Sequence, residues 1–359
     1  MPEIIVIIVA VIVLLNLLCI KAYFKLRNYT VSKFNQLKIS LIIPFKNEEK
    51  VLPHLLESIL SVDYATENFE IILVDDNSTD NSIKLIEEFS VKNLRIIKAE
   101  NKTIPGKKGA LEIGIKQANF DIIAITDADC IIGKNWLKSI SHKISEGYDL
   151  VFGYSPFIKG QKIISKVSAY ENLRNFILYF FSVELGFPYG ATARSIAFKK
   201  SVYIEVNGYR NTTETLSGDD DLFIRECIKK NFKVGYFLDK DSYVQTYPSE
   251  NFIEYIFRKS RHLKTSHHYL LKQKIILTVW YSINFIANLS IFFIPLTFYF
   301  VIPFAVKIIL DLILLKLIKS KIEHDFNFNE IIYLEFIYQL LVAVNFIASL
   351  VLKDNWKKS

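Results

Sequence analysis

Four short apolar runs recur in the first third of the chain, and each ends in polar or charged residues. The runs are Ile39–Ile43, Ile71–Val74, Leu94–Ile97 and Ile122–Thr126. They lie roughly 25 to 30 residues apart, which is the length of one strand–helix–strand unit. Apolar residues recur at helical spacing between them, in Glu49–Leu60, Asn81–Phe89 and Lys107–Ala118. The pattern predicts an α/β fold with a mainly parallel sheet flanked by helices.

Polar residues follow all four predicted strands, in the sequences PFKNEE, DDNSTD, AEN and DAD. The carboxyl ends of parallel strands meet at one edge of a sheet, and α/β proteins bind ligands in the crevice there. Carboxylates at this density suit Mg²⁺ or Mn²⁺, which bind through one or two carboxylates together with substrate phosphates. We therefore expect an acidic, cation-binding crevice formed by Asp75, Asp76, Asp127 and Asp129.

Simpler explanations exist for both acidic sequences. In DDNSTD, Ser78, Thr79 or Asp80 can satisfy the free amides of a following helix, although this leaves Asp75 and Asp76 unexplained. DAD can merely begin a turn. Two carboxylates this close to a buried strand need either a cationic partner or a turn open to water.

Longer apolar runs flank this region. Ile4–Ile20 contains no charged residue and is followed by Lys21, Lys25, Arg27 and Lys33. In a signal peptide the charges precede the apolar run, so we interpret residues 1–24 as a membrane anchor.

The C-terminal part of the chain is also apolar. Ile275–Ile318 has 44 residues, or about 66 Å as a helix, which is enough for two membrane crossings. Ile331–Leu352 is long enough for one more. Residues 274–352 are therefore expected to hold about three transmembrane helices. Lys307 and Asp311 within them either pair with each other, four residues apart on one helix, or mark a transport path.

The basic cluster after the first apolar run places residues 37–250 in the cytoplasm, on a multi-pass protein of a bacterial inner membrane. The sequence KSKIEHD agrees with this topology, but the C-terminal KDNWKKS falls on the wrong side unless one apolar segment is interfacial or re-entrant. Residues 251–273 interleave aromatic and basic side chains, which is typical of an amphipathic helix at the membrane surface.

The net charge and the cysteine content indicate which binding partners and metal sites to expect. The net charge of +7 is concentrated near the membrane junctions, which favours anionic lipid headgroups and gives no reason to expect a nucleic-acid partner. The three cysteines have no metal-ligand spacing, so neither a disulfide framework nor a zinc site is expected.

Taken in order, the motifs from about Leu37 to Lys264 resemble the membrane-associated family 2 glycosyltransferases, which have a GT-A nucleotide-sugar-binding fold. SLIIPFKNEEKVLPHLLESIL resembles the opening strand and helix of that family, IILVDDNSTDNS its nucleoside-binding segment, PGKKGALEIGI its Gly-Lys segment and TDADC its Asp-x-Asp motif. The resemblance implies donor contacts from Pro44, Asp75 or Asp76, Lys107 and Asp127. It also implies that Asp129, with Asp127, holds a Mg²⁺ or Mn²⁺ ion on the diphosphate.

The acceptor side departs from the family pattern. In LSGDDDL the usual Glu-Asp pair corresponds to Gly218 and Asp219, which makes Asp219 the expected general base and Asp220 a neighbour that tunes it. A solvated acidic helix cap is the alternative. Arg258 and Arg261 are expected on the acceptor or phosphate side, but His262 stands where many members have Trp, so processive synthesis is not expected.

The expected function is metal-dependent, inverting transfer of a sugar from a nucleotide-diphospho-sugar to a lipid or lipid-linked glycan. A non-catalytic nucleotide-sugar-binding subunit and a transport protein with a regulatory soluble domain are the alternatives.

Overall fold

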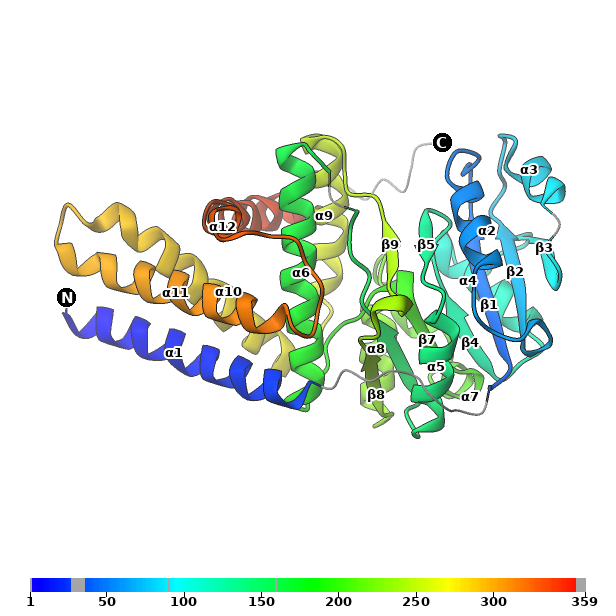
Figure 1. Ribbon diagram of the computed structural model, residues 1–359, viewed down its shortest axis with the longest axis horizontal. Helices are drawn as coiled ribbons and strands as arrows, with labels where there is room; N and C mark the ends of the chain where they lie inside the picture. The colour runs from blue at the N-terminus through cyan, green and yellow to red at the C-terminus, as the bar shows by residue number, and fades with distance from the viewer. Residues whose placement is uncertain (1, 27–35, 90, 159, 353–359) are drawn as a thin grey trace. The chain divides into compact units, whose positions relative to one another are not determined.

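The computed structural model describes residues 2–26, 36–89, 91–158 and 160–352 of the 359-residue chain (Figure 1). These residues form two compact units. The α/β unit contains residues 36–158 and 188–248, and the helical unit contains residues 2–26, 160–187 and 249–352. The assignment of 37–250 to one domain is therefore corrected, because helix α6 (Ile163–Glu184) packs against α1, α9 and α12 of the helical unit.

The α/β unit is built on a seven-stranded sheet of order β3-β2-β1-β4-β7-β6-β8. Strands β1 to β4 are parallel to one another, whereas β7 is antiparallel to both of its neighbours. The predicted mainly parallel sheet is thus confirmed. The strands are β1 Ile39–Phe45, β2 Phe69–Asp75, β3 Leu94–Lys98, β4 Ile122–Ile125, β6 Leu150–Gly153, β7 Ile196–Lys199 and β8 Val234–Phe237.

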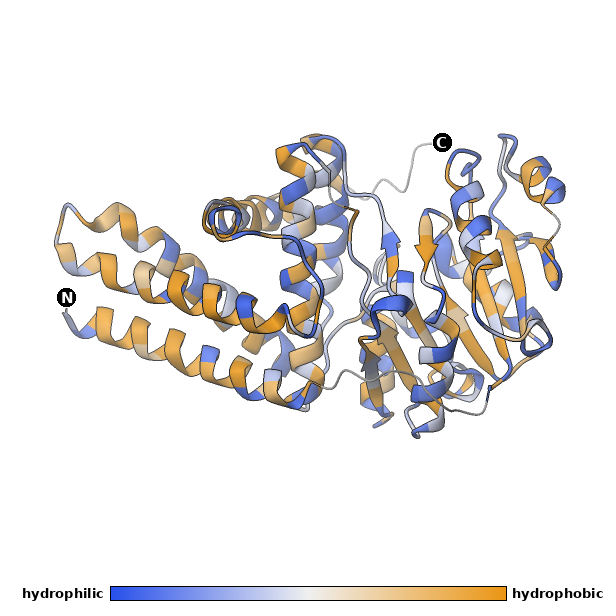
Figure 2. Ribbon diagram, in the orientation of Figure 1, coloured by the Kyte–Doolittle hydropathy of each residue, from blue (hydrophilic) through white to orange (hydrophobic). Residues whose placement is uncertain are grey.

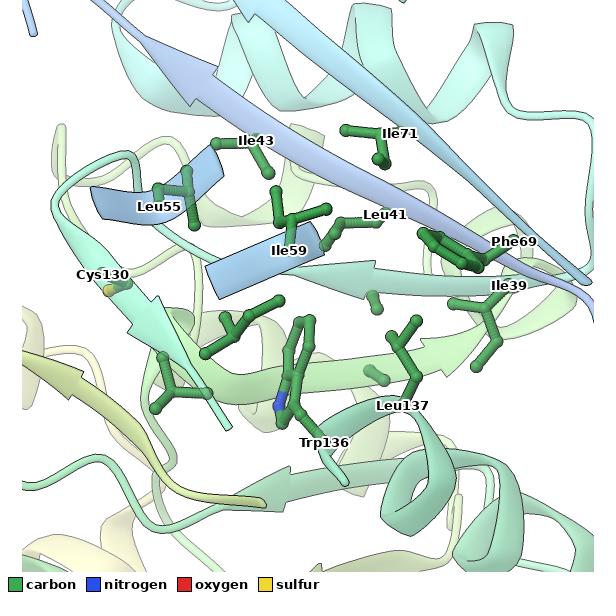
Figure 3. Packing of buried hydrophobic residues seen from close by; sticks show 14 of the residues in the cluster. Ile39, Leu41, Ile43, Leu55, Ile59, Phe69, Ile71, Cys130, Trp136 and Leu137 are labelled. Atoms are coloured by element: carbon green, nitrogen blue, oxygen red, sulfur yellow. The ribbon is translucent and has the colours of Figure 1, made fainter. Parts of the chain in front are cut away.

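Helices cover both faces of the sheet. Because alternate side chains of a strand point to opposite faces, Ile39, Leu41 and Ile43 of β1 face α2 (Leu52–Leu60) and α5 (Trp136–Ser145) (Figure 3). Helix α4 (Lys107–Gln117) lies on the other face. It approaches so closely that a Cβ on Gly114 would lie 2.6 Å from Ile42 Cγ2.

The α/β unit also contains three further helices and a second, smaller sheet. They are the helices α3 Ser82–Glu88, α7 Lys200–Glu205 and α8 Asp221–Lys229, and a two-stranded ribbon of β5 Cys130–Ile132 and β9 Val244–Thr246. The three helices expected between the first four strands are present, with ends within a few residues of those predicted.

The helical unit contains α1 Pro2–Lys25, α6, α9 Phe252–Ser266, α10 Leu271–Leu289, α11 Val301–Ile318 and α12 Phe328–Val351. Apolar residues dominate α1 along most of its length (Figure 2). In the described residues, three helical stretches are long and apolar enough to cross a membrane: Pro2–Lys25, Leu271–Phe293 and Phe328–Val351. Four crossings were expected; α11 carries Lys307, Asp311 and Lys316 and is not among the three.

Candidate active site

The loops that follow β1 and β2 are hydrogen-bonded to each other. Backbone N–H groups of the first loop donate to side chains of the second: Asn47 to Ser78 Oγ (3.1 Å), Glu48 to Ser82 Oγ (2.9 Å) and Glu49 to Asp80 Oδ2 (3.1 Å). Asp80 Oδ1 also accepts from the Ser82 N–H at the start of α3 (3.0 Å), so the helix-cap explanation holds for Asp80. The two loops therefore form one rigid rim at the carboxyl edge of the sheet.

Asp75 and Asp76 sit inside this rim and are both buried. Asp75 ends β2, and its Oδ1 accepts from the Ser78 N–H (2.8 Å), which fixes the turn. Asp76 forms an ion pair with the Lys102 ammonium. Sequence reasoning missed Lys102, because nothing in the sequence indicates which carboxylate a lone loop lysine meets.

Pro44 is a buried residue of β1, opposite Val74 of β2. The pairing of β1 with β4 ends at Ile42, so the central strand tolerates a residue without an N–H at this point. The structure thus places Pro44 within the sheet, directly below the rim.

Lys107 joins the predicted donor and acceptor sides. As the first residue of α4, it places Nζ 2.6 Å from Asp127 Oδ1, just beyond β4, and 2.6 Å from Asp219 Oδ2, just before α8. Asp127 therefore has the cationic partner that its position demands. Asp129 is exposed in the turn after β4. It therefore lies in a turn open to water, which was the other way to accommodate a carboxylate close to a buried strand.

The crevice is less acidic than the sequence suggests. Lys102 and Lys107 each compensate one of the four expected carboxylates, and Asp75 is engaged by its own turn. Within the described residues, no three His, Cys, Asp or Glu side chains group closely enough to hold a metal ion unaided.

The neighbouring Asp219 and Asp220 differ in proton affinity. Burial by itself raises the pKa of Asp219, but the Lys107 ammonium outweighs this effect and holds that pKa below its usual range. Burial, reinforced by the charges of Asp221 and Asp219, raises the pKa of Asp220 well above its usual range. Burial also lowers the pKa of Lys107, but the Asp127 and Asp219 carboxylates more than reverse this.

Asp220 is the N-cap of α8. Its Oδ1 accepts from the Asp221 N–H (2.7 Å), and its Oδ2 accepts from the Ala193 N–H (3.0 Å). Asp221 is the first residue of the helix. The acidic-cap explanation therefore describes Asp220, while the carboxylate of Asp219 faces Lys107.

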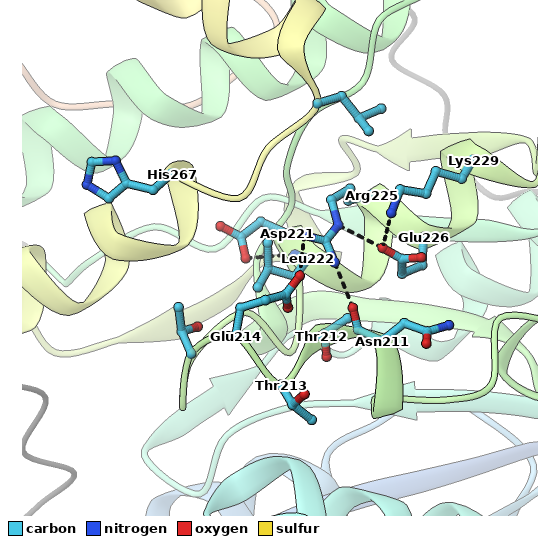
Figure 4. A network of polar contacts seen from close by, with 12 residues as sticks. Asn211, Thr212, Thr213, Glu214, Asp221, Leu222, Arg225, Glu226, Lys229 and His267 are labelled. Atoms are coloured by element: carbon cyan, nitrogen blue, oxygen red, sulfur yellow. Dashed lines mark hydrogen bonds and ion pairs between the residues drawn. The ribbon is translucent and has the colours of Figure 1, made fainter.

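Two buried cations brace the loop that leads to Asp219. Lys108 donates to the carbonyl oxygens of Thr212 and Thr215, the latter at 3.2 Å. Arg225 of α8 donates to the Asn211 carbonyl (2.7 Å) and pairs with Glu214 (2.8 Å) (Figure 4). A cavity of about 180 Å³ lies between this loop and the start of α4, lined by Ile104, Pro105, Lys108 and residues 213–216. Sequence reasoning missed Lys108, because its carbonyl partners lie 104 and 107 residues away in the chain, and it missed Arg225, because a basic residue in a helix does not indicate that it binds the preceding loop.

Arg258 and Arg261 lie on α9 of the helical unit, and both are half-buried. Their expected role beside the acceptor or the phosphates stays a prediction.

Comparison with known proteins identifies the α/β unit. Residues 40–202 match the family model of glycosyl transferase family 2. The chain is 36% identical over 124 residues, 34% of its length and 37% of the relative's, to the undecaprenyl-phosphate 4-deoxy-4-formamido-L-arabinose transferase of Proteus mirabilis. It is 28% identical over 205 residues, 55% of its length and 46% of the relative's, to the probable glycosyltransferase YdaM of Bacillus subtilis.

A beta-monoglucosyldiacylglycerol synthase of Synechocystis is 30% identical over 105 residues, 29% of this chain and 22% of the relative. The chain thus spans less than half the length of these relatives. In fold it resembles the mannosyltransferase PcManGT from Pyrobaculum calidifontis, solved with GDP-Man and Mn²⁺, with a TM-score of 0.60, 14% identity and coverage of 97% of this chain and 100% of that one. Residues 40–202 are therefore assigned to glycosyl transferase family 2.

Proposed function

We propose that the protein is a membrane-bound glycosyltransferase that moves a sugar from a nucleotide-diphospho-sugar to a lipid or lipid-linked glycan. The observation that carries the proposal is the contact of Lys107 with both Asp127 and Asp219, which brings a donor-side acid, a cation and an acceptor-side acid together. Two relatives named for undecaprenyl-phosphate and diacylglycerol substrates, together with the apolar helices, support a lipid acceptor.

The oxygen donors at the sheet edge fit a divalent cation. Asp129 presents an exposed carboxylate and Asp127 a partly exposed one, and one or two carboxylates are what Mg²⁺ or Mn²⁺ uses when substrate phosphates complete its shell. Asp129 and Asp127 would hold the ion. When bound, it would supply positive charge to the diphosphate leaving group. The Mn²⁺ in PcManGT supports this assignment.

The residues of the chain account for the rest of the transfer. Asp219 takes the proton of the acceptor hydroxyl, whose oxygen bonds to the anomeric carbon as the bond from that carbon to the phosphate oxygen breaks. The bonding electrons leave with the nucleoside diphosphate, and the Lys107 ammonium stabilises the added charge. Attack opposite the leaving group inverts the anomeric centre. Asp76 and Lys102 are the polar groups available to the nucleoside, and transfer of one sugar per encounter is expected.

The test is the Asp129→Ala variant. We expect it to lose turnover and the metal-dependent part of donor binding while it keeps its thermal stability, because the side chain is exposed beyond the strand. Wild-type turnover in the presence of a chelator would refute the metal role. A binding subunit would bind nucleotide sugars without hydrolysing or transferring them. A transport protein would show flux into vesicles that survives loss of Asp129.

A further inference from the structure

Helix α12 (Phe328–Val351) has the length and hydropathy of a transmembrane helix, and the sequence predicts that it crosses the membrane. Its contacts contradict this. We propose that α12 lies in the plane of the membrane interface, beside α6 and α9, and that both of its ends are on one side of the bilayer. The proposal needs membrane association but is independent of the proposed transfer reaction.

A lysine of α6 and a lysine of α9 hold the two ends of α12. In its first turn, Glu330 Oε1 lies 3.1 Å from Lys166 Nζ of α6. At its C-terminal end, the carbonyl of Leu352 accepts from Lys264 Nζ of α9 at 2.5 Å. A helix of 24 residues is about 36 Å long, so in a transmembrane orientation its two ends would lie on opposite membrane surfaces.

Helix α9 fixes the depth of the C-terminal half of α12. Its sequence FIEYIFRKSRHLKTS carries Glu254, Arg258, Lys259, Arg261 and Lys264, and charges at this density do not lie in hydrocarbon. Asn345 of α12 donates to Tyr255 Oη (3.0 Å), and the Phe346 ring lies 6.2 Å from that of His267. Residues 345–352 therefore contact a helix that stays at the membrane surface.

The other apolar helices meet α12 at one place. Its Glu335 pairs with Lys307 of α11, and its Phe336 ring lies 6.1 Å from that of Phe292, just after α10. In Figure 1, α1, α10 and α11 run across the view, whereas α12 is seen nearly end-on. Helices α1 and α10 both pack against α11. These three share a direction that α12 crosses.

The exposed face of α12 suits lipid. The helix buries its polar residues Glu330, Glu335, Gln339 and Asn345 within the helical unit. It exposes apolar ones instead: Leu340, Val344, Ile347, Leu350 and Val351. This is the reverse of a water-exposed helix. An apolar outer face beside the basic helix α9 fits the boundary between headgroups and acyl chains.

The proposed orientation also removes the conflict between the C-terminal lysines and the positive-inside rule. The terminal KDNWKKS, which lies outside the described residues, begins where α12 ends and so starts on the same side as α9. Its three lysines then obey the positive-inside rule together with those after the first apolar run.

Cysteine labelling of the full chain in intact and permeabilised cells tests the proposal. The native thiols Cys19, Cys130 and Cys227 are buried and give little background. We expect Ser359→Cys to label from the same side of the membrane as Asp325→Cys, which lies between α11 and α12, and as Glu250→Cys, which precedes α9. If Ser359→Cys and Asp325→Cys label from opposite sides, α12 crosses the membrane and the proposal fails.

Depth measurement is an independent check that needs no terminal label. Spin labels at Leu340→Cys, Ile347→Cys and Leu350→Cys occupy exposed positions, so they disturb no packing. In an interfacial helix the three depths differ by only a few ångströms. In a transmembrane helix, positions 340 and 350 differ in depth by about 15 Å, and that result would overturn the proposal.

Discussion

At the scale of single residues, Lys107 is the side chain whose removal has the clearest consequence for the chemistry. The Lys107→Met variant removes the main charge that opposes the effect of burial on Asp219 and leaves the smaller effect of Lys108, so the pKa of Asp219 rises. A general base must be ionised, and the acid side of the pH–kcat profile should therefore move to higher pH. We also expect donor affinity to fall about tenfold or more, because a charged contact to phosphate is lost.

Lys116→Met is the matched control, since Lys116 lies on the same helix, has an exposed side chain and pairs with Glu112, which is not one of the predicted site residues. It should change neither the profile nor the donor affinity. Identical pH profiles for Lys107→Met and the wild type would remove Lys107 from the environment of the base.

Gly218 stands where the family usually has Glu, and the backbone accounts for the difference. Its φ is +87°, and a Cβ there would lie 2.6 Å from Leu222 Cγ. Gly218→Ala should therefore cost about 2 kcal/mol or more of stability and lower turnover, because Asp219 follows directly. Gly147→Ala is the control: its φ is +92° but nothing lies within 4 Å. Equal losses of thermal stability in the two variants would show that the Leu222 contact does not matter.

The sequence predicted those site residues that can be identified from their neighbours in the chain. Asp75, Asp76, Asp127 and Asp129 follow apolar strands, and strand order brings them to one edge. The partners Lys102, Lys108 and Arg225 are ordinary basic residues in the sequence. They become informative only when the fold shows which carboxylate or carbonyl each one meets.

At the scale of elements, the strands β1 to β4 and the helices between them were predictable, because the strands are short continuous apolar runs and the helices carry apolar residues at helical spacing. Helix α6 was not. It lies in sequence between β6 and β7 yet packs with helices from both ends of the chain. The sequence allowed one apolar segment to be interfacial but did not indicate which one, since hydropathy measures how apolar a helix is and not which helices hold its ends.

Buried charges tie α6, α11 and α12 together. Asp311 of α11 lies 2.9 Å from Arg174 of α6 and 2.8 Å from Lys307, which also pairs with Glu335 of α12. The pairing of Lys307 with Asp311 is confirmed, and these charges satisfy one another within the helical unit instead of lining a transport path. Two cations face two carboxylates in this cluster.

Asp311→Asn leaves two buried cations with one carboxylate, and we expect a loss of about 3–5 kcal/mol, measured as a lower midpoint of thermal unfolding in detergent. Asp325→Asn changes an exposed aspartate after α11 and should leave the midpoint within a degree or two. Equal midpoints for the two variants would mean that the cluster contributes no net stability.

At the scale of the whole molecule, the chain passes from one unit to the other and back, since it leaves the α/β unit after β6 to form α6 and returns to it before β7. The family match over residues 40–202 therefore includes a helix whose packing partners, α1, α9 and α12, lie outside the match. A fragment cut at the boundaries of the α/β region keeps α6 but loses every helix that covers it.

A fragment of residues 36–248 should therefore need detergent, although it lacks α1 and the C-terminal apolar helices. Phe176, Phe180 and Phe181 of α6 are buried in the full chain and would become exposed in the fragment. We expect the fragment to sediment in ultracentrifugation without detergent. Phe180→Ser should have opposite effects on the fragment and on the full chain. It should make the fragment more soluble, because it breaks an exposed apolar patch. It should destabilise the full chain by about 3–5 kcal/mol, because it empties a packed site. A monodisperse, detergent-free fragment would show that α6 folds onto the α/β unit by itself.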